Sequence, residues 1–162
     1  MRASDSPRTR YDPRRYSSGD EVTSARVRTA RDYWQSKRSG GSLPLRAQID
    51  PLDVPRLLPY LMLIEVVEGR LRYRLAGTQV VANAGFDFTG RYLDELQFAN
   101  RDFYLGCYGE ILKARTPLFG IDHWVYPDGR NGVSEYGMLP LSSDGQSVSH
   151  FLTVEENVEF ES

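Results

Sequence analysis

Two apolar runs joined by a tight turn give the clearest pattern in the chain. Residues 61–67 are mostly apolar with several β-branched side chains, and residues 71–76 alternate apolar residues with Arg. Gly69 lies between them, where a hairpin loop favours a positive φ. Because side chains along a strand alternate with a period of two, the apolar set of the second run should face the core. That set is Leu71, Tyr73 and Leu75.

Two longer stretches have the spacing of amphipathic helices. The first is predicted over residues 18–38, because Ser18 and Glu21 have the spacing of a capping box and a Gly pair follows the stretch. The second follows Asn100, which is placed to cap it, and ends before Thr116-Pro117. Its apolar residues recur at intervals of three and four, as expected for a helix that packs on a core.

The remaining elements are short. Short helices are predicted from Asp50-Pro51, over residues 78–84 and near residues 92–96. Strands are predicted over residues 118–126, 134–141 and 147–154, separated by turn sequences rich in Gly, Asp and Ser. This order predicts an α+β fold: a five-stranded antiparallel sheet with helices on one face and an N-terminal flanking helix.

Composition divides the chain into four segments. Residues 1–17 are rich in Arg, Ser, Asp and Pro and are predicted to form a disordered basic arm. Residues 18–38 are assigned to the flanking helix and residues 43–156 to the folded domain. Residues 157–162 are predicted to be a frayed acidic tail, and the adjacent carboxylates Glu155 and Glu156 are interpreted as solvated surface.

Charge and cysteine content exclude several classes of protein. The 162 residues, 40% of them hydrophobic, suffice for one domain with a core. A net charge of −2 argues against nucleic-acid binding. Cys107 is the only cysteine, which agrees with a reducing, cytoplasmic location. No apolar run is long enough to cross a membrane, and none follows Arg14-Arg15 as a secretory signal would require.

The order of elements and four sequence strings resemble the PAS domain superfamily, and within it the single-domain PAS-like proteins of alphaproteobacteria. The strings are YWQSKRSGGSLPLRAQIDPLDVPRLLPYLMLIEV (33–66), YRLAGTQV (73–80), TGRYLDEL (89–96) and MLPLSSDG (138–145). They span most of the predicted domain. The resemblance implies a sensory or protein-interaction module, usually without catalysis, and it implies no particular ligand or partner.

The sequence contains no nucleophile elbow, phosphate-binding loop or dinucleotide fingerprint. We therefore expect a non-catalytic protein that acts in signal transduction by binding. A ligand or partner would favour one of two packings of the sheet against its flanking helix. Because the sequence shows no kinase, cyclase or DNA-binding segment, the output is expected in trans, through a signalling protein that the sequence does not identify.

The residues argue against haem, flavin and metal sites. His123 and His150 are the only histidines, and neither has metal-ligand spacing with Cys107. PAS modules that hold haem usually place a histidine on or beside the long helix, where this chain has none. Flavin photochemistry in the superfamily needs a cysteine on a short helix, and residues 89–93 lack one. Cys107 is interpreted as inert core packing.

Aromatic residues from several elements should meet where the long helix crosses the sheet. Such a set can line a mostly apolar ligand pocket with a few hydroxyls, or it can simply fill a core, and the sequence leaves both readings open. The pocket candidates are Tyr73, Leu75, Phe103, Cys107, Tyr108, Ile111, Trp124, Tyr136 and Met138.

A second class of function remains open, a small α+β enzyme with a cone-shaped pocket, of the isomerase or dehydratase kind. It would need a buried acid or base with a shifted pKa, and the candidates are Asp122 and His123. Burial of either residue beside Tyr136 would favour the enzyme, and exposure of both would favour the binding module.

The helix predicted over residues 18–38 has two interpretations. It is either a cap packed on its own domain or the interface of a homodimer, in which aromatic anchors would dominate the binding energy. We expect the homodimer, with Val22, Ala25, Tyr33 and Trp34 crossing the interface.

Overall fold

The computed structural model describes residues 13–98, 100–126 and 128–161. Six strands form one antiparallel sheet in the order β1-β4-β5-β6-β2-β3, so the predicted α+β class is confirmed with one strand more than expected. The strands are β1 (Arg14–Arg15), β2 (Leu61–Val67), β3 (Arg70–Ala76), β4 (Leu118–Val125), β5 (Asn131–Ser142) and β6 (Val148–Glu161). The helices are α1 (Ala25–Ser36), α2 (Thr78–Ala84) and α3 (Arg101–Ala114), joined by short 3-10 turns.

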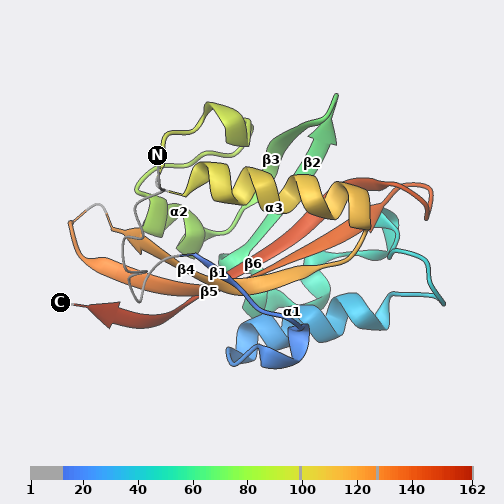
Figure 1. The fold of residues 1–162 in the computed structure, drawn as a ribbon, viewed down its shortest axis with the longest axis horizontal. Coiled ribbons are helices and arrows are strands. Elements are labelled where there is room, and N and C mark those ends of the chain that lie inside the picture. The colour runs from blue at the N-terminus through green and yellow to red at the C-terminus, as the bar shows by residue number, and fades with distance from the viewer. Residues whose placement is uncertain (1–12, 99, 127, 162) are drawn as a thin grey trace, which may run out of the picture.

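The sheet has a hydrophobic core on each face. Figure 1 shows α3 across one face and α1 across the other. The first core lies between the sheet and α2 and α3, and it includes Ile64, Tyr108 and Met138. The second lies beneath α1 and includes Trp34 and Leu139. The central strand β5 therefore has both faces buried.

The β2–β3 hairpin forms as predicted, but its alternation changes part-way along. Glu68 and Gly69 both have positive φ, as a two-residue hairpin turn requires. Leu63 then pairs with Leu75 while Ile64 pairs with Tyr73, so β3 carries a bulge at Arg74. Leu71 and Tyr73 belong to the core under α3, whereas Leu75 packs on the opposite core. The prediction that all three share one face is wrong for Leu75, because the bulge reverses the alternation.

A buried carboxylate determines where α1 begins. Glu135 on β5 accepts hydrogen bonds from the backbone N–H groups of Thr23 (3.0 Å) and Ser24 (2.7 Å) and from the hydroxyl of Tyr16 (2.6 Å). These bonds hold residues 22–24 extended against the sheet, so the helix starts at Ala25 with Ser24 as its N-cap. The capping box that predicted a helix from residue 18 forms, but it closes only the 3-10 turn Gly19–Glu21.

Both ends of the described chain extend the sheet further than predicted. Residues 14 and 15 pair with Ile121 and Gly120 of β4, so the C-terminal part of the predicted disordered arm is a strand. Residues 1–12 lie outside the described residues. The prediction of a frayed tail is also wrong for residues 157–161, because β6 continues to Glu161 and pairs with β5, which begins at Asn131. Residue 162 lies outside the described residues.

Helix α1 packs on the sheet of its own chain. Val22 and Trp34 are each only 1% exposed, and the indole Nε1–H of Trp34 donates to the carbonyl oxygen of Pro140 (2.8 Å). These two side chains are therefore not available to a second subunit, contrary to the expected interface. Ala25 is exposed, and Tyr33 is half-buried with its hydroxyl bonded to Asp53 (2.7 Å).

Replacing Glu135 with Gln should destabilise the fold. The substitution keeps the shape of the side chain but turns an amide NH2 toward backbone N–H donors and removes charge-assisted bonds. We expect the free energy of unfolding to fall by about 2–3 kcal/mol, measured by urea denaturation.

The matched control is Glu110→Gln on α3, whose carboxylate pairs with Arg15 at the exposed surface. It should cost less than about 1 kcal/mol. Equal losses in the two variants would show that the carboxylate of Glu135 does not hold the N-terminal segment in place.

Candidate functional site

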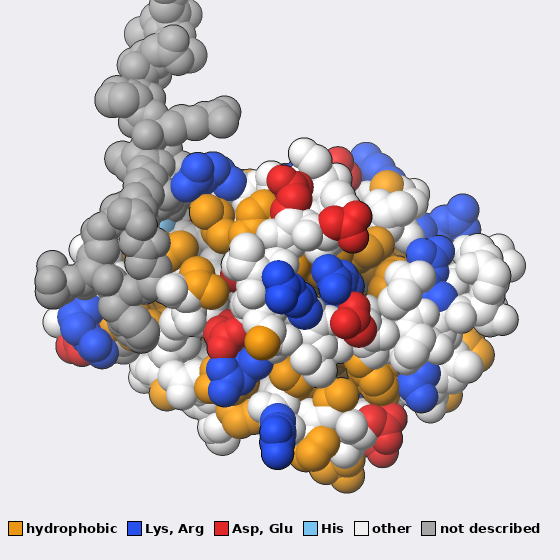
Figure 2. Space-filling model, turned by 90° about the horizontal axis from the view of Figure 1, so that it is seen from below, with side chains coloured by type: hydrophobic (Ala, Val, Ile, Leu, Met, Phe, Trp, Pro, Cys, Tyr) orange, Lys and Arg blue, Asp and Glu red, His pale blue; other side chains and the backbone are white. Residues whose placement is uncertain are grey.

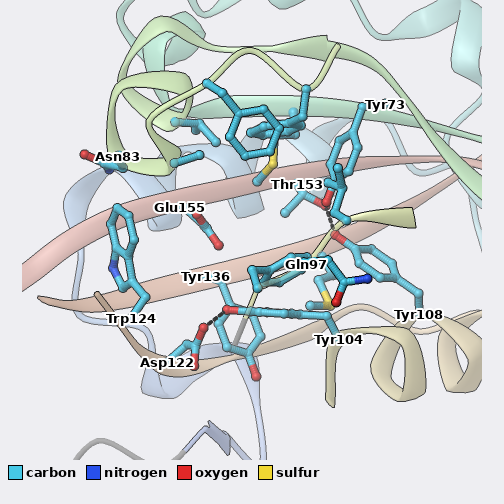
Figure 3. A pocket seen from close by; sticks show the side chains of 18 of the residues that line it. Tyr73, Asn83, Gln97, Tyr104, Tyr108, Asp122, Trp124, Tyr136, Thr153 and Glu155 are labelled. Carbon is cyan, nitrogen blue, oxygen red and sulfur yellow. Dashed lines mark hydrogen bonds between the residues drawn. The ribbon is translucent and has the colours of Figure 1, made fainter. Parts of the chain in front are cut away.

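A cavity of about 350 Å³ lies between the sheet and the helices α2 and α3. Figure 3 shows lining side chains that come from the strands β3 to β6, from α2 and α3, and from the segment between these helices. Phe86, Phe98 and Val125 line it and are also largely exposed, so they mark the place where the cavity meets solvent. The other lining residues are Met62, Tyr73, Val80, Asn83, Ala84, Phe88, Leu96, Gln97, Tyr104, Tyr108, Asp122, Trp124, Tyr136, Met138, Thr153 and Glu155.

Asp122 is a buried, hydrogen-bonded carboxyl group in the cavity wall. It is 4% exposed, and its carboxylate accepts hydrogen bonds from the side-chain amide of Asn100 (2.7 Å) and from the hydroxyl of Tyr104. Burial raises the pKa of Asp122 to about 6, and these two hydrogen bonds hold it from rising further. The group is therefore a carboxyl that titrates close to neutral pH.

Asn100 reaches Asp122 because of its backbone conformation. It precedes α3 with φ at 66°, a left-handed conformation that Asn tolerates better than most residues. Its side chain makes no cap to the helix, contrary to the prediction, and instead donates to Asp122 and to the carbonyl oxygen of His123 (3.0 Å). Asn100 thus ties the start of α3 to β4.

Glu155 is a second carboxyl in the wall. It projects from β6 opposite Tyr136 and is half-buried. Burial raises the pKa of Glu155 to about 7, and the negative charge of Asp122 contributes in the same direction. The reading of Glu155 as solvated surface is therefore wrong. The alternation along β6 that places Phe151 and Thr153 on this face was the signal for it.

Four tyrosines line the cavity, beside the polar side chains of Asn83, Gln97, Trp124 and Thr153. The hydroxyls of Tyr108 and Thr153 share a hydrogen bond (2.8 Å), and the rings of Tyr73 and Phe88 meet edge to face, with centroids 4.6 Å apart. Burial raises the pKa of Tyr73, Tyr104 and Tyr108. Their hydroxyls are therefore protonated near neutral pH, and that of Tyr104 donates to Asp122.

Tyr136 contributes its ring to the cavity but not its hydroxyl, which points toward β1 and donates to the carbonyl oxygen of Arg14 (3.4 Å). The ring crosses Gly120 on the neighbouring strand. A Cβ atom there would lie 2.5 Å from the hydroxyl oxygen of Tyr136 and 2.0 Å from that carbonyl oxygen. Only glycine allows this close approach.

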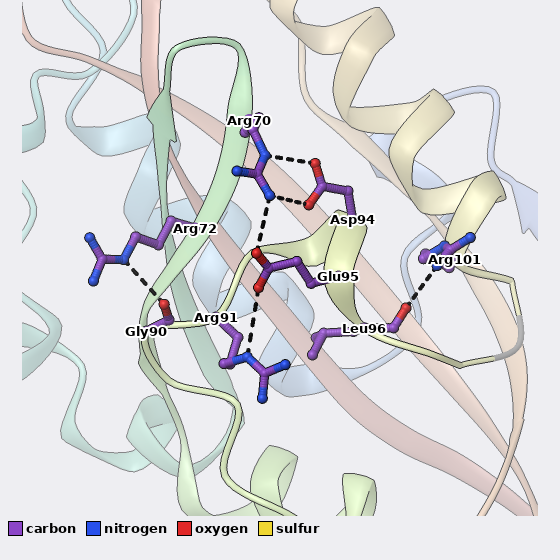
Figure 4. Close-up of polar contacts among 8 residues, drawn as sticks. All are labelled: Arg70, Arg72, Gly90, Arg91, Asp94, Glu95, Leu96 and Arg101. Atoms are coloured by element: carbon purple, nitrogen blue, oxygen red, sulfur yellow. Dashed lines mark hydrogen bonds and ion pairs between the residues drawn. The ribbon is translucent and has the colours of Figure 1, made fainter.

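The segment that closes the cavity on one side is fixed by ion pairs (Figure 4). Arg70 on β3 makes two hydrogen bonds to Asp94 (2.8 and 2.9 Å) and one to Glu95 (3.3 Å). Arg101 at the start of α3 donates to the carbonyl oxygen of Leu96 (3.1 Å). These contacts attach residues 85–98 to the hairpin on one side and to α3 on the other.

Five of the nine pocket candidates line the cavity, and four do not. Leu75 lies on the opposite face of the sheet because of the bulge, and Phe103 is half-buried beside Tyr104. Cys107 and Ile111 pack in the core away from the cavity lining, and burial raises the pKa of the Cys107 thiol. The candidates in the lining are Tyr73, Tyr108, Trp124, Tyr136 and Met138.

The described lining contains no His and no Cys, so it offers neither side chain that the resemblance connects with haem ligation or flavin photochemistry. His123 points away from the cavity and shares a hydrogen bond with Asn131 (3.0 Å). The described residues contain no group of three or more His, Cys, Asp or Glu that would hold a metal ion.

Comparison with known proteins gives the family. A family model for the PAS domain matches residues 22–154, most of the chain. The chain belongs to the PAS domain family. The alphaproteobacterial branch and the dimer expected from the sequence remain predictions. A search of curated proteins found no significant match.

Solved structures with this PAS fold include a light-oxygen-voltage domain studied with a flavin analogue (14% identity, TM-score 0.54, covering 70% of this chain and 88% of that one). An RNA-binding light-oxygen-voltage receptor matches at 14% identity and a TM-score of 0.49, covering 74% of this chain and 37% of that one. A PAS domain from Colwellia psychrerythraea matches at 12% identity and a TM-score of 0.47, covering 67% and 98%.

Glu155→Gln should change how stability depends on pH. In the folded PAS domain Glu155 keeps its proton up to about pH 7, whereas the unfolded side chain releases it near 4.5. The stability that protonation contributes is therefore present at low pH and lost as the pH rises through about 7. The variant should melt at a higher temperature than the wild type at about pH 8, with the gap closing toward about pH 5, in paired thermal scans. A difference in melting temperature that is independent of pH, or that grows as the pH falls, would contradict the raised pKa of Glu155.

Proposed function

We propose that this PAS domain is a non-catalytic sensor that binds a small molecule in its core cavity and signals in trans, in the cytoplasm. Membership of the PAS family supports a role in sensory signalling. The observation that carries the proposal is the cavity itself. At about 350 Å³ it falls within the size range of small-molecule sites, and its wall combines aromatic rings with a few fixed polar groups.

The central strands offer a route from the cavity to the surface. Tyr136 and Glu155 face the cavity. The residue before Tyr136, Glu135, points to the opposite face and holds Thr23 and Ser24. The residue after Glu155, Glu156, also points there and accepts from the side chains of Ser24 and Arg26. A ligand that shifts β5 or β6 therefore acts directly on the start of α1.

The surface around α1 suits a protein partner better than a nucleic acid. Where described residues form this face, Figure 2 shows basic side chains scattered among acidic and apolar ones, with no continuous basic patch. Electrostatic recognition of a phosphate backbone requires such a patch. No helix among the described residues has the length and apolarity needed to span a membrane.

A catalytic function, as a small α+β enzyme, remains a second candidate because Asp122 is buried in the cavity wall and its pKa is raised. A carboxyl that titrates near neutral pH is suited to general acid–base catalysis. Its hydrogen-bonding partners are Asn100 and Tyr104, however, and the hydroxyl of Tyr136 points away toward β1. Turnover of a bound molecule that Asp122→Asn abolishes, without loss of binding, would identify an enzyme.

Blocking the cavity should abolish ligand retention. Ala84 lies at the end of α2 in the cavity lining and is exposed, so Ala84→Trp should fill the cavity from its edge without disturbing the core. Ala82 is exposed on the same helix but does not line the cavity, which makes Ala82→Trp the matched control. Native mass spectrometry of protein purified from its source cells should show a bound small molecule in the wild type and in Ala82→Trp, and none in Ala84→Trp. A wild type without any bound molecule would contradict the proposal.

Ligand binding should also protect the N-terminal segment. If the route through β5 and β6 operates, hydrogen exchange of the backbone amides in residues 22–27 should be slower in the liganded protein than in protein stripped of ligand. Hydrogen–deuterium exchange measured by mass spectrometry checks this. The distant hairpin turn at residues 68–69 serves as the internal reference, and protection confined to the cavity lining would exclude signalling through α1.

A further inference from the structure

The charges of the cavity wall are unbalanced. The described lining includes two carboxyl groups, those of Asp122 and Glu155, and no Lys, Arg or His. A ligand that enters this space meets negative charge whenever either carboxyl is ionised. Anions are disfavoured there, because a like charge at close range in a poorly solvated site is repelled far more strongly than in water.

The two carboxyls differ in what they can offer a ligand. Asp122 already accepts hydrogen bonds from Asn100 and Tyr104. Among the described residues no donor reaches Glu155, although it lies within the cavity lining. A half-buried carboxylate without a hydrogen-bond donor is less stable than one in open water, and either a proton or a cation relieves it. Glu155 is therefore the acceptor that a ligand can complete.

The rest of the wall suits the apolar part of a cation. Tyr73, Phe88 and Trp124 contribute aromatic rings to the cavity lining. The rings of Tyr104 and Tyr136 also line it, with their centroids 5.8 Å apart. Aromatic faces attract cations through their quadrupole and also bury hydrocarbon surface. Two carboxyls do not suffice for a metal ion, which normally takes more ligands.

We propose that the ligand of the cavity is a small organic cation, a primary amine on an aromatic or aliphatic body, with its ammonium group paired to Glu155. This inference rests on the proposed function and adds the chemical class of the ligand. The ammonium supplies the donors that Glu155 lacks, Asp122 adds a second negative charge, and the aromatic rings enclose the body of the ligand.

Three probes of similar size and different charge test the preference: 2-phenylethylamine, 2-phenylethanol and phenylacetate. Calorimetric titration of the stripped protein at about pH 8 should show the amine binding at least about tenfold more tightly than the alcohol, and no binding of the acid. Glu155→Gln should sharply reduce the preference for the amine, leaving only the contribution of Asp122, while keeping the affinity for the alcohol. Glu65→Gln, on β2 outside the cavity lining and paired with Arg74, is the matched control and should keep the preference.

A second measurement uses the wild type alone. The titratable groups lining the cavity are two carboxyls, Asp122 on β4 and Glu155 on β6, and four tyrosines. The tyrosines are Tyr73 on β3, Tyr104 and Tyr108 on α3, and Tyr136 on β5. The pKa of each of these tyrosines is raised, so only the carboxyls titrate near neutral pH. Affinity for the amine should fall as the pH is lowered from about 8 to about 5, while affinity for the alcohol stays constant.

The outcomes separate this inference from the proposed function. Equal binding of amine and alcohol, tighter binding of phenylacetate, or failure of all three probes would overturn the assignment of a cationic ligand. None of these results touches the proposed function, which depends on whether a small molecule is retained by the wild type and lost in Ala84→Trp. If that experiment finds a neutral or acidic molecule, the proposal of a cationic ligand is wrong, whereas the proposal of a small-molecule sensor stands.

Discussion

The burial of strand β5 on both faces is the constraint on which the rest of the structure depends. A central strand without a solvent face needs one cover above and another below, and the chain supplies α2 and α3 for the first and α1 for the second. The carboxylate of Glu135 then requires partners, because a buried charge without hydrogen bonds is costly. Residues 16–24 provide them, so the N-terminal segment is part of the domain rather than an appendage.

Local patterns were sufficient for the elements whose geometry depends on neighbours in sequence. The turn at Gly69, the end of α2 at Gly85 and the apolar face of α3 follow from positive φ and helical spacing. The bulge at Arg74 and the late start of α1 depend on contacts between residues far apart in the chain. No window of the sequence contains that information, and the errors at Leu75 and at residues 18–24 follow from this.

The candidate site shows the same division. Alternation along the second strand of the hairpin placed Tyr73 on the core face, and the expected crossing of the long helix over the sheet brought Tyr136 and Met138 into the same set. The polar network was not predictable, since Asn100 reaches Asp122 only through a left-handed backbone that leaves its helix uncapped. Glu155 was missed because an acidic residue near a chain end resembles solvated surface until its strand is paired.

The missing side chain of Gly120 has a consequence for the capacity of the binding site. Gly120 does not line the cavity, yet the space it leaves lets Tyr136 lie flat with its hydroxyl beneath β1. Any larger residue would have to displace either the first strand or the ring, and the ring has the cavity on its other side. The volume open to a ligand therefore depends on the absence of a Cβ atom at residue 120 of the neighbouring strand. Among related chains, the residue at this position would indicate which of them keep a hollow core and which have filled it.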